Sequence, residues 1–255
     1  MLSKNILITG GASGIGFGIA QQLATLGHQI IIADLQLNTA QEAARKLSDA
    51  GYSASAIAVD VSQAEHVAAL PGRLSPLKID VLINNAGIQH VSRIEDFPAD
   101  KWQQLINIML VGPALMTQAF LPSMREQNFG RIINIGSVHS LIASPFKSAY
   151  VAAKHGLLGF AKTIALETGD CNITINTICP AYVRTPLVDK QIAAQALEHG
   201  ISEDDVVNKI MLEPMPKKSF IEMDELAATA AFLIADTARN ITAQTMVIDG
   251  GWTAR

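Results

Sequence analysis

The stretch "ITGGASGIG" at residues 8–16 joins two segments of different pattern. The aliphatic run "NILIT" at 5–9 precedes it, and an Ala- and Leu-rich periodic segment over 14–26 follows it. This order predicts a strand that turns directly into a helix, and glycines at the turn let the backbone approach a ligand closely. Because the N-terminus of a helix offers free N–H groups, the turn is suited to a diphosphate. The loop residues predicted to hold such a ligand are Gly10, Ser13, Gly14, Ile15 and Gly16.

The same alternation of strand and helix patterns continues along the chain. The predicted strands are apolar almost throughout, as expected when helices cover both faces of a parallel sheet. No Gly-, Ser- or Pro-rich linker divides residues 1–255. The sequence therefore predicts one α/β domain, a Rossmann-like doubly wound sheet of seven mainly parallel strands with helices on both faces. Strands are predicted at 5–9, 29–34, 55–60, 80–85, 130–137, 173–179 and 244–249, and helices at 14–26, 38–50, 62–74, 97–124, 146–168 and 224–236.

One stretch, residues 186–218, interrupts this alternation where a short connection would be enough. It follows the carboxyl end of a predicted strand, and ligands of open α/β sheets bind outside those ends. We therefore expect a helical lid over a substrate site, in preference to a surface excursion.

Composition narrows the class of ligand. The chain has a formal net charge of −4, and its Lys and Arg residues are scattered singly, which argues against nucleic-acid and anionic-membrane partners and favours a small molecule. Cys171 and Cys179 show neither a disulfide framework nor the spacing of a metal site, so we expect two reduced core residues and no metal. With no signal-peptide pattern and no membrane-spanning run evident, the expected compartment is the cytoplasm.

Acidic residues follow the next two predicted strands. A carboxylate at Asp34 would hydrogen-bond the ribose hydroxyls of an adenosine and repel a 2′-phosphate. No Lys or Arg lies between Gly10 and Asp34, so the sequence predicts NAD in preference to NADP, although Asp34 could be a turn residue instead. Asp60 faces an adenine on the same argument, but capping of the following helix explains it equally well.

The stretch "SPFKSAYVAAKHG" at 144–156 is predicted to open a helix, with Ser144 as its cap. Lys147, Tyr150 and Lys154 then share one helical face. A free phenol has a pKa near about 10 and is a poor base at neutral pH, whereas a neighbouring cation favours its ionised form. We therefore expect Lys154 to lower the pKa of Tyr150; a solvated helix face is the alternative.

Several motifs together resemble the short-chain dehydrogenase/reductase family over the whole chain: the glycine loop, "NNAG" at 84–87, Ser137, and "YVAAK" at 150–154. The resemblance implies hydride transfer with a nicotinamide cofactor. It implies that Tyr150 exchanges the proton of the substrate hydroxyl, that Ser137 hydrogen-bonds the substrate oxygen, and that Lys154 also holds the nicotinamide ribose. A simple strand-end hydroxyl is the alternative for Ser137. Further cofactor contacts implied by the resemblance are Val61, Asn84, Ala86, Gly87, Val183 and Thr185.

Longer matches, including "NNAGIQH", "IEDFP" and "DGGWTAR", resemble family members that act on a short 3-hydroxy acid. They imply NAD-dependent interconversion of (R)-3-hydroxybutyrate and acetoacetate. Those members usually have Trp where this chain has Tyr182. Each polar contact has a structural alternative, such as a loop hydrogen bond or a solvent-facing side chain. The implied substrate contacts are Gln89, Ser137, His139, Lys147, Tyr150, Tyr182, Gln191 and Trp252.

Two other functions remain open. A 3-oxoacyl or acetoacetyl thioester reductase using NAD(P) would have the same fold, but Asp34 and the weakly acidic composition disfavour it. A non-catalytic dinucleotide sensor would not need Ser137, Tyr150 and Lys154 together. The resemblance further implies a homotetramer, with the helices near 97–124 and 147–168 forming one interface and the C-terminal strand lying near another.

The chain departs from the family at Met109, which occupies the position of the usual catalytic asparagine. Asn107 lies roughly 200° away around a helix and cannot substitute for it. In the family, the main-chain carbonyl at this position holds a water that links the active-site lysine to solvent. Pro113 has no N–H to donate to the carbonyl of Met109. Either Pro113 preserves this relay carbonyl or it only bends the helix for packing.

Overall fold

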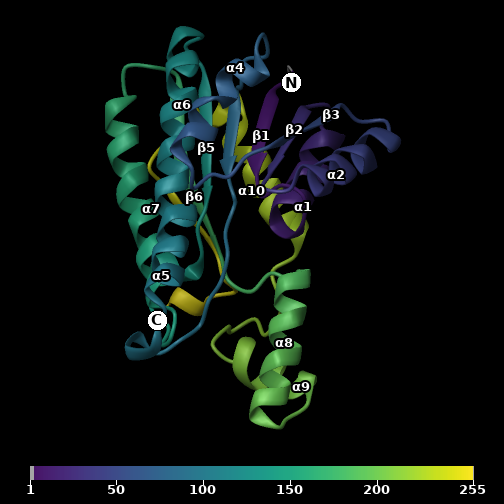
Figure 1. Ribbon diagram of the computed structural model, residues 1–255, viewed down its shortest axis with the longest axis vertical. Coiled ribbons are helices and arrows are strands. Elements are labelled where there is room, and N and C mark those ends of the chain that lie inside the picture. The colour runs from purple at the N-terminus through teal and green to yellow at the C-terminus, as the bar shows by residue number, and fades with distance from the viewer. Residues whose placement is uncertain (1–2, 255) are drawn as a thin grey trace.

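Seven strands form one sheet in the order β3-β2-β1-β4-β5-β6-β7 (Figure 1). The structure, a computed structural model, describes residues 3–254, apart from the side chains at 186, 187 and 199. Every neighbouring pair of strands is parallel, so the predicted α/β sheet is confirmed and is parallel throughout. The strands are β1 (Asn5–Thr9), β2 (Gln29–Asp34), β3 (Ala54–Ala58), β4 (Val81–Asn84), β5 (Gly130–Ile135), β6 (Ile173–Pro180) and β7 (Thr245–Ile248).

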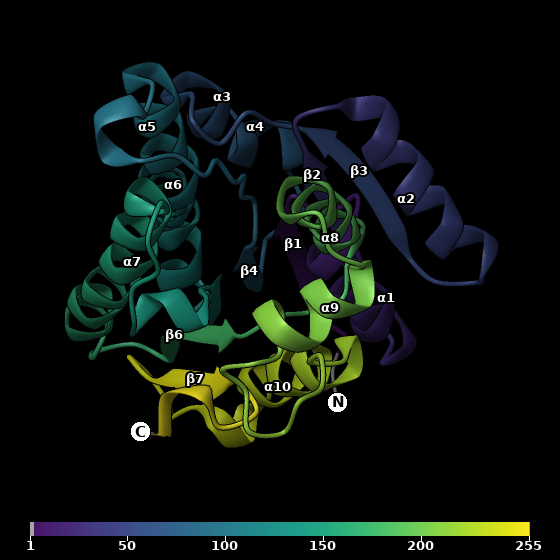
Figure 2. The ribbon, with the colours of Figure 1, turned by 90° about the horizontal axis from the view of Figure 1, so that it is seen from below.

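Helices cover both faces of this sheet, and Figure 2 shows α5 to α7 on one side and α1 and α2 on the other. The helices are α1 (Gly14–Thr25), α2 (Leu37–Asp49), α3 (Ala64–Ala68), α4 (Leu70–Leu74), α5 (Ala99–Ile106), α6 (Gly112–Glu126), α7 (Ser148–Glu167), α8 (Pro186–His199), α9 (Glu203–Val206) and α10 (Met223–Ile234).

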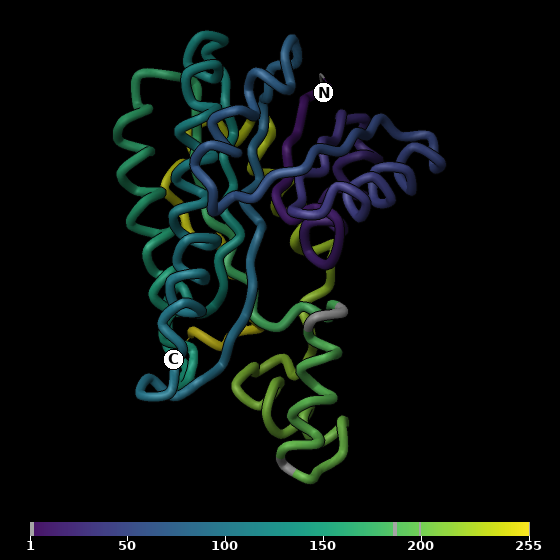
Figure 3. The backbone as a smooth tube through the Cα atoms, in the orientation of Figure 1, coloured from purple at the N-terminus to yellow at the C-terminus, as the bar shows by residue number. Residues whose placement is uncertain are grey.

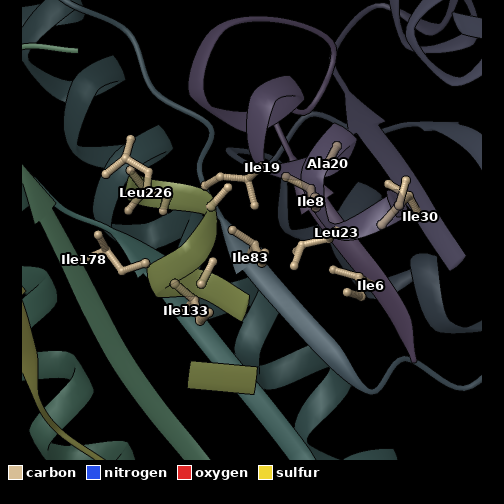
Figure 4. Close-up of a cluster of buried hydrophobic side chains, with 14 of the residues drawn as sticks. Ile6, Ile8, Ile19, Ala20, Leu23, Ile30, Ile83, Ile133, Ile178 and Leu226 are labelled. Atoms are coloured by element: carbon tan, nitrogen blue, oxygen red, sulfur yellow. The ribbon is translucent and has the colours of Figure 1, made fainter. Parts of the chain in front are cut away.

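Two apolar layers hold these helices on the sheet, because side chains of successive strand residues point to opposite faces. One layer packs α1, α2 and α10 on the sheet, and Figure 4 shows Ile19 of α1 and Leu226 of α10 against Ile8 and Ile83 of the strands. The other layer packs α3, α4, α6 and α7, and Phe120 of α6 lies in it. Both faces of the central strands are therefore covered, which explains why these strands are mostly apolar, whereas the edge strands β3 and β7 are partly exposed.

The order of the strands reverses beside β1, which pairs with β2 on one side and with β4 on the other. In open α/β sheets this reversal leaves a crevice at the carboxyl ends of the strands. The loops after β1 and β4 both open there. The chain between β4 and α5 then runs to the end of the molecule where the C-terminus lies (Figure 3).

Two boundaries differ from the sequence prediction because of local backbone chemistry. β3 ends at Ala58, so Asp60 lies beyond the strand, where its carboxylate accepts hydrogen bonds from the backbone N–H and hydroxyl of Ser62 at 2.9 and 2.6 Å. The helix predicted over 62–74 is divided into α3 and α4, with Pro71 in the first turn of the second. A proline lacks the N–H that would continue the first helix.

The helix predicted from Ser144 begins later, at Ser148. Phe146 has φ of 65°, in the left-handed region, which a right-handed helix excludes. Ser144 is therefore not the cap, and Lys147 occupies that position. Tyr150 and Lys154 lie within α7 as predicted.

The helix predicted over 97–124 is continuous from Ala99 to Glu126 but includes a π-helical segment, Asn107–Val111. Gly112 donates its N–H to the carbonyl of Asn107, one residue further back than in an α-helix. Pro113 follows at once and cannot make the α-type bond to Met109.

By length and mean hydropathy, the helix from Ala99 to Glu126 could cross a membrane, so the expectation that no segment is long and apolar enough was wrong. Buried helices of soluble proteins have the same composition, and 39% of its most apolar window is buried in this fold. Leu105, Met116 and Phe120 are among the residues that it buries.

Residues 186–218 form a projection of their own. In Figure 1, α8 and α9 extend below the sheet and its helices. A second π-helical segment, Val207–Met211, continues α9. Ile192, Val206 and Met211 form a small separate apolar cluster.

Candidate active site

A cavity of about 520 Å³ opens at the carboxyl ends of the strands. It extends from the loop after β1 to the base of the 186–218 projection. The structure gathers almost all of the predicted site residues around it, although they come from distant parts of the sequence. Those lining it are Gly10, Ser13, Gly14, Ile15, Asp34, Asp60, Val61, Ala86, Gly87, Gln89, Met109, Ser137, His139, Lys147, Tyr150, Lys154, Tyr182, Val183, Thr185, Gln191 and Trp252.

The glycine loop has the geometry of an anion-binding turn. Gly10 and Gly14 have φ of 60° and 53°, a backbone conformation that residues other than glycine rarely adopt. A Cβ added to Gly14 would make an ordinary van der Waals contact with Thr185 at 3.8 Å, so the backbone conformation and not the space around it favours glycine here. Ser13 is the N-cap of α1 but makes no side-chain capping bond, so its hydroxyl and the first N–H groups of the helix are free for a ligand. The loop therefore fits the diphosphate of a dinucleotide.

Two predicted cofactor residues do not line the cavity. Asn84 is buried in β4 and donates its amide to Asn134 of β5 at 2.9 Å. Gly16 lies under the loop, where a Cβ would be 2.5 Å from both the carbonyl oxygen of Gly10 and the amide nitrogen of Asn85. Neither residue faces the cavity: Asn84 joins β4 to β5, and Gly16 leaves room for the glycine loop and Asn85.

Asn85, which the sequence analysis missed, lines the cavity instead. Its amide donates to the carbonyls of Thr9 and Gly10, each at 3.0 Å, and thereby fixes the glycine loop to the end of β4. The hydroxyl of Thr9 completes this junction by accepting the N–H groups of Asn85 and Ala86. The second Asn of "NNAG" was the available signal.

The two acidic residues take part in local turns at the end of the cavity that lies beside β2 and β3. The carboxylate of Asp34 accepts the N–H of Ala12 at 3.2 Å. One oxygen of Asp60 accepts both hydrogen bonds from Ser62, so the alternative of a helix-start role is partly correct although Gln63 is the N-cap. Both carboxylates still line the cavity.

Ser137 begins a short 3₁₀ helix, Val138–Ser140, directly after β5. Its hydroxyl accepts the N–H of His139 at 3.1 Å, and its own N–H donates to the hydroxyl of Ser140 at 3.2 Å. This reciprocal capping holds the Ser137 hydroxyl at the sheet edge, beside Tyr150.

The charges of Tyr150 and Lys154 are controlled mainly by burial. Burial raises the pKa of the Tyr150 phenol, and a hydrogen bond with the Ser137 side chain partly opposes this. Burial also lowers the pKa of Lys154 to about 8. The ammonium group donates to the carbonyl of Ile135 at 2.6 Å and lies 5.7 Å from the centroid of the Tyr150 ring. The predicted lowering of the Tyr150 pKa by Lys154 is therefore not found in this structure, because burial raises this pKa and Lys154 is not among the groups that shift it.

A second lysine, Lys147, faces the same cavity beyond Tyr150. Burial lowers its pKa. In the described part of the chain its ammonium group has no carboxylate within salt-bridge distance. His139 lies near it with a pKa lowered to about 4, first by burial and then by the charge of Lys147, so this imidazole is neutral at neutral pH. The Nδ1 atom of His139 is buried and has no partner among the described residues.

Aromatic rings form the wall opposite these polar groups. Tyr182 stacks on Trp252 with ring centroids 5.8 Å apart and an interplanar angle of 25°. Trp252 also meets the ring of His139 edge to face at 5.8 Å. Gln89 and Gln191 line the cavity too, and the side-chain oxygen of Gln89 accepts the N–H of His90.

Met109 is buried in the π-helical segment and lines the cavity beside Gly87. A Cβ added to Gly87 would lie 3.5 Å from the sulfur of Met109. The thioether thus fills space in an apolar wall and brings no hydrogen-bonding group to it.

Several other residues line the cavity and were not predicted, mainly because they are apolar and resemble core residues in sequence. Leu35, which follows Asp34, is 64% exposed and provides an apolar surface at the end of the cavity beside β2. The others are Ala33, Val59, Ile88, Ile108, Ile135, Gly136, Val138, Pro180, Ala181 and Val188.

The cysteines lie outside the cavity lining. Cys179 is buried as predicted, but Cys171 is only partly buried, next to Arg125 and Asp170. Within residues 3–254, side chains at 186, 187 and 199 excepted, no group of three or more His, Cys, Asp or Glu residues is arranged to hold a metal ion.

Comparison with known proteins agrees with this geometry. Residues 4–196 match the short chain dehydrogenase family. The whole chain is 42% identical over 261 residues to a D-beta-hydroxybutyrate dehydrogenase of Rhizobium meliloti (strain 1021), with 100% of both chains covered. A D-beta-hydroxybutyrate dehydrogenase of Cupriavidus necator is also 42% identical, over 99% of this chain and 98% of the relative.

A solved structure has the same fold. It is a variant of the actinorhodin polyketide ketoreductase with NADPH, similar to this chain with a TM-score of 0.93 and 28% identity over 99% of this chain and 98% of that one. The fold, the match over most of the chain and these relatives agree with the motifs from which the sequence analysis began. The chain is therefore an oxidoreductase and belongs to the short-chain dehydrogenase/reductase family.

Proposed function

We propose that the protein interconverts (R)-3-hydroxybutyrate and acetoacetate with NAD. The observation that carries this proposal is Lys147, a partly buried cation that shares the cavity with Tyr150 and Ser137 and has no carboxylate partner in the described structure. An ammonium group in such a position is stabilised by an anionic ligand. The identity to D-beta-hydroxybutyrate dehydrogenases supports the same substrate.

Ser137 and Tyr150 act on the oxygen at the reacting carbon in this proposal. Their hydrogen bond places both hydroxyls at one point of the cavity. In its ionised form Tyr150 takes the proton of the alcohol during oxidation, and in the neutral form that burial favours it returns the proton during reduction. Ser137 donates a hydrogen bond to the same oxygen. A nicotinamide dinucleotide bound here would accept or supply the hydride.

Lys147 binds the carboxylate of the substrate, together with the neutral His139 and the amides of Gln89 and Gln191. Because His139 has a pKa of about 4, it serves as a hydrogen-bonding group and not as a second cation at neutral pH. The rings of Tyr182 and Trp252 cover the methyl end of a four-carbon acid.

The dinucleotide would be held by the glycine loop, Asp34 and the residues that follow β4 and β6. Asp34 favours NAD, since its carboxylate would repel a 2′-phosphate. We expect kcat/KM for NAD to exceed that for NADP by roughly 10 to 100-fold, because a charged contact contributes about 1.5 to 3 kcal/mol. Equal kcat/KM values for the two cofactors would contradict this assignment.

The segment 186–218 and the carbonyl of Met109 also take part in this function. We infer that residues 186–218 act as a lid, since they project beside the cavity and Gln191 of α8 lines it. We also infer that the carbonyl of Met109 serves the water relay from Lys154. The π-helical segment supports this role because Pro113 cannot donate to that carbonyl.

The test uses reduced-nicotinamide absorbance with NAD and each enantiomer of 3-hydroxybutyrate. Lys147→Met should lower kcat/KM for the (R) acid by roughly 10 to 100-fold, and that for an uncharged secondary alcohol far less. Lys162→Met, on the exposed face of the same helix, is the matched control. If the methyl ester reacts as well as the acid in the parent protein, the carboxylate site is wrong. Faster turnover of an acetoacetyl thioester with NADPH would favour the thioester reductase.

A further inference from the structure

A closed hydrogen-bonded turn ends the described chain, and its centre is the buried carboxylate of Asp249. One oxygen accepts the N–H of Gly251 at 2.8 Å. The other accepts the N–H and the hydroxyl of Thr253, at 2.7 and 2.6 Å. Burial raises the pKa of this carboxyl, but the hydrogen bonds from Thr253, Gly251 and Trp252 outweigh it and hold the pKa below its usual value. The turn is therefore organised around an ionised group at neutral pH.

The backbone of this turn is shaped for close contact. Gly250 and Gly251 have φ of 59° and 89°, a region that other residues rarely adopt. A Cβ on Gly250 would lie 3.1 Å from the terminal methyl carbon of Met215, and one on Gly251 would lie 3.3 Å from Cγ of Pro216. The carbonyl of Gly250 also accepts the N–H of Lys217 at 3.2 Å. The turn is thus packed tightly against the limb 215–217, which returns from the lid to the sheet.

The same turn delivers Trp252 to the cavity. The N–H of Trp252 donates to the carbonyl of Asp249 at 3.2 Å, and the indole then lies between Tyr182 and His139. Tyr182 precedes the lid and is joined to the chain that follows it, because its carbonyl accepts the N–H of Ile221 at 2.8 Å. Trp252 therefore joins the aromatic wall of the substrate pocket to the base of the lid.

We propose that Asp249 is a positioning residue for the substrate: through Thr253 and the two glycines it fixes Trp252 as the pocket wall and holds the returning limb of the lid. This proposal rests on the proposed function for the meaning of the pocket. Asp249 itself lies outside the cavity lining and reaches the substrate only through Trp252.

The experiment uses Trp252 as its own reporter. The chain has 2 tryptophans, so Trp102→Phe leaves Trp252 alone. In that background, Asp249→Asn keeps the size of the side chain but turns an amide N–H toward an N–H donor. We expect acrylamide quenching of Trp252 to increase at least about twofold, and KM for (R)-3-hydroxybutyrate to increase at least roughly tenfold, while kcat and the Kd for NADH change less than about threefold.

Three variants complete the comparison. Thr253→Val removes the hydroxyl donor and should raise KM by roughly two- to fivefold, whereas Thr253→Ser retains it and should keep the parent KM. Asp170→Asn, an ion-paired carboxylate that is 73% exposed, is the control for loss of a charge. If Asp249→Asn does not fold by circular dichroism, the two Thr253 variants decide the outcome.

An unchanged KM, or a lower kcat at unchanged KM, would mean that the turn stabilises the fold only, and the proposal would be overturned. Unchanged quenching of Trp252 would overturn it as well. Should the parent protein fail to oxidise 3-hydroxybutyrate, the proposed function fails, but the quenching comparison still decides whether Asp249 positions Trp252.

Discussion

Tyr150 and Lys154 are both pushed toward their neutral forms, since burial raises the pKa of the phenol and lowers that of the amine. Among the described residues, the Ser137 side chain is the group that lowers the pKa of Tyr150. At the scale of single residues, the chemistry of the site thus depends on desolvation as much as on charge pairs.

Tyr150→Phe removes the phenolic hydroxyl and keeps the ring that packs near His139. If Tyr150 exchanges the proton of the substrate, kcat should fall by roughly 100-fold or more while the Kd for NADH stays near that of the parent. Steady-state kinetics and a fluorescence titration of NADH measure the two quantities. Turnover near the parent value would exclude Tyr150 as the acid/base.

Lys154→Met tests the effect of the buried amine on stability. Its pKa is lowered from 10.5 to about 8 in the folded chain, so between these values the unfolded chain binds more protons. The free energy of unfolding of the parent should therefore rise, relative to that of the variant, from about pH 7 to about pH 10. Urea unfolding at both pH values measures the difference. A difference that stays constant would mean that the pKa of Lys154 is not lowered.

Helix α7 contains two glycines, Gly156 and Gly159, that differ in the space around them. A Cβ on Gly156 would lie 2.9 Å from Leu110 of the π-helical segment, whereas a Cβ on Gly159 would meet nothing within 4 Å. Gly159→Ala should stabilise the fold by about 0.4 to 1 kcal/mol because it restricts the unfolded chain. Gly156→Ala should be less stable than Gly159→Ala by about 1 to 2 kcal/mol, since Leu110 must move. Denaturant unfolding at equal protein concentration compares them, and equal stabilities would contradict the packing argument.

The π-helical segment Asn107–Val111 leaves the carbonyl of Met109 without an α-type hydrogen bond from Pro113. Pro113→Ala supplies the missing N–H, so this N–H can donate to the carbonyl of Met109 and make it unavailable to the relay water. We expect a lower kcat and a larger solvent deuterium effect in this variant, and little change in Met109→Asn. If Pro113→Ala has the kinetics of the parent, the proline serves packing alone.

For the whole molecule, the family resemblance predicts a tetramer of the 27.2 kDa chain in which α7 faces another copy. Leu166 at the end of α7 and Leu197 on α8 are both 86% exposed in the single chain. Leu166→Glu should therefore reduce the mass measured by light scattering, and Leu197→Glu should leave it unchanged. A parent protein with the mass of one chain would contradict the predicted assembly.

Much of the site could be predicted from local sequence because its residues stand at the ends of recognisable elements. The glycine loop and Asp34 follow apolar strands, and Tyr150 and Lys154 share a helical period. The roles of Asn84 and Asn85 could not be assigned this way. Their side chains point to opposite sides of the chain, and only the neighbouring strands determine which one reaches the cavity.

The sequence by itself determined the class of fold and the order of its elements, because apolar runs, helical periods and glycines act over a few residues. Tertiary structure decided where α7 begins, where the helix before Pro113 widens, and which groups burial leaves neutral. It also decided that Asp249, near the end of the chain, supports a pocket wall beside Tyr182. Such features depend on contacts between residues far apart in sequence, whose desolvation and packing no local pattern records.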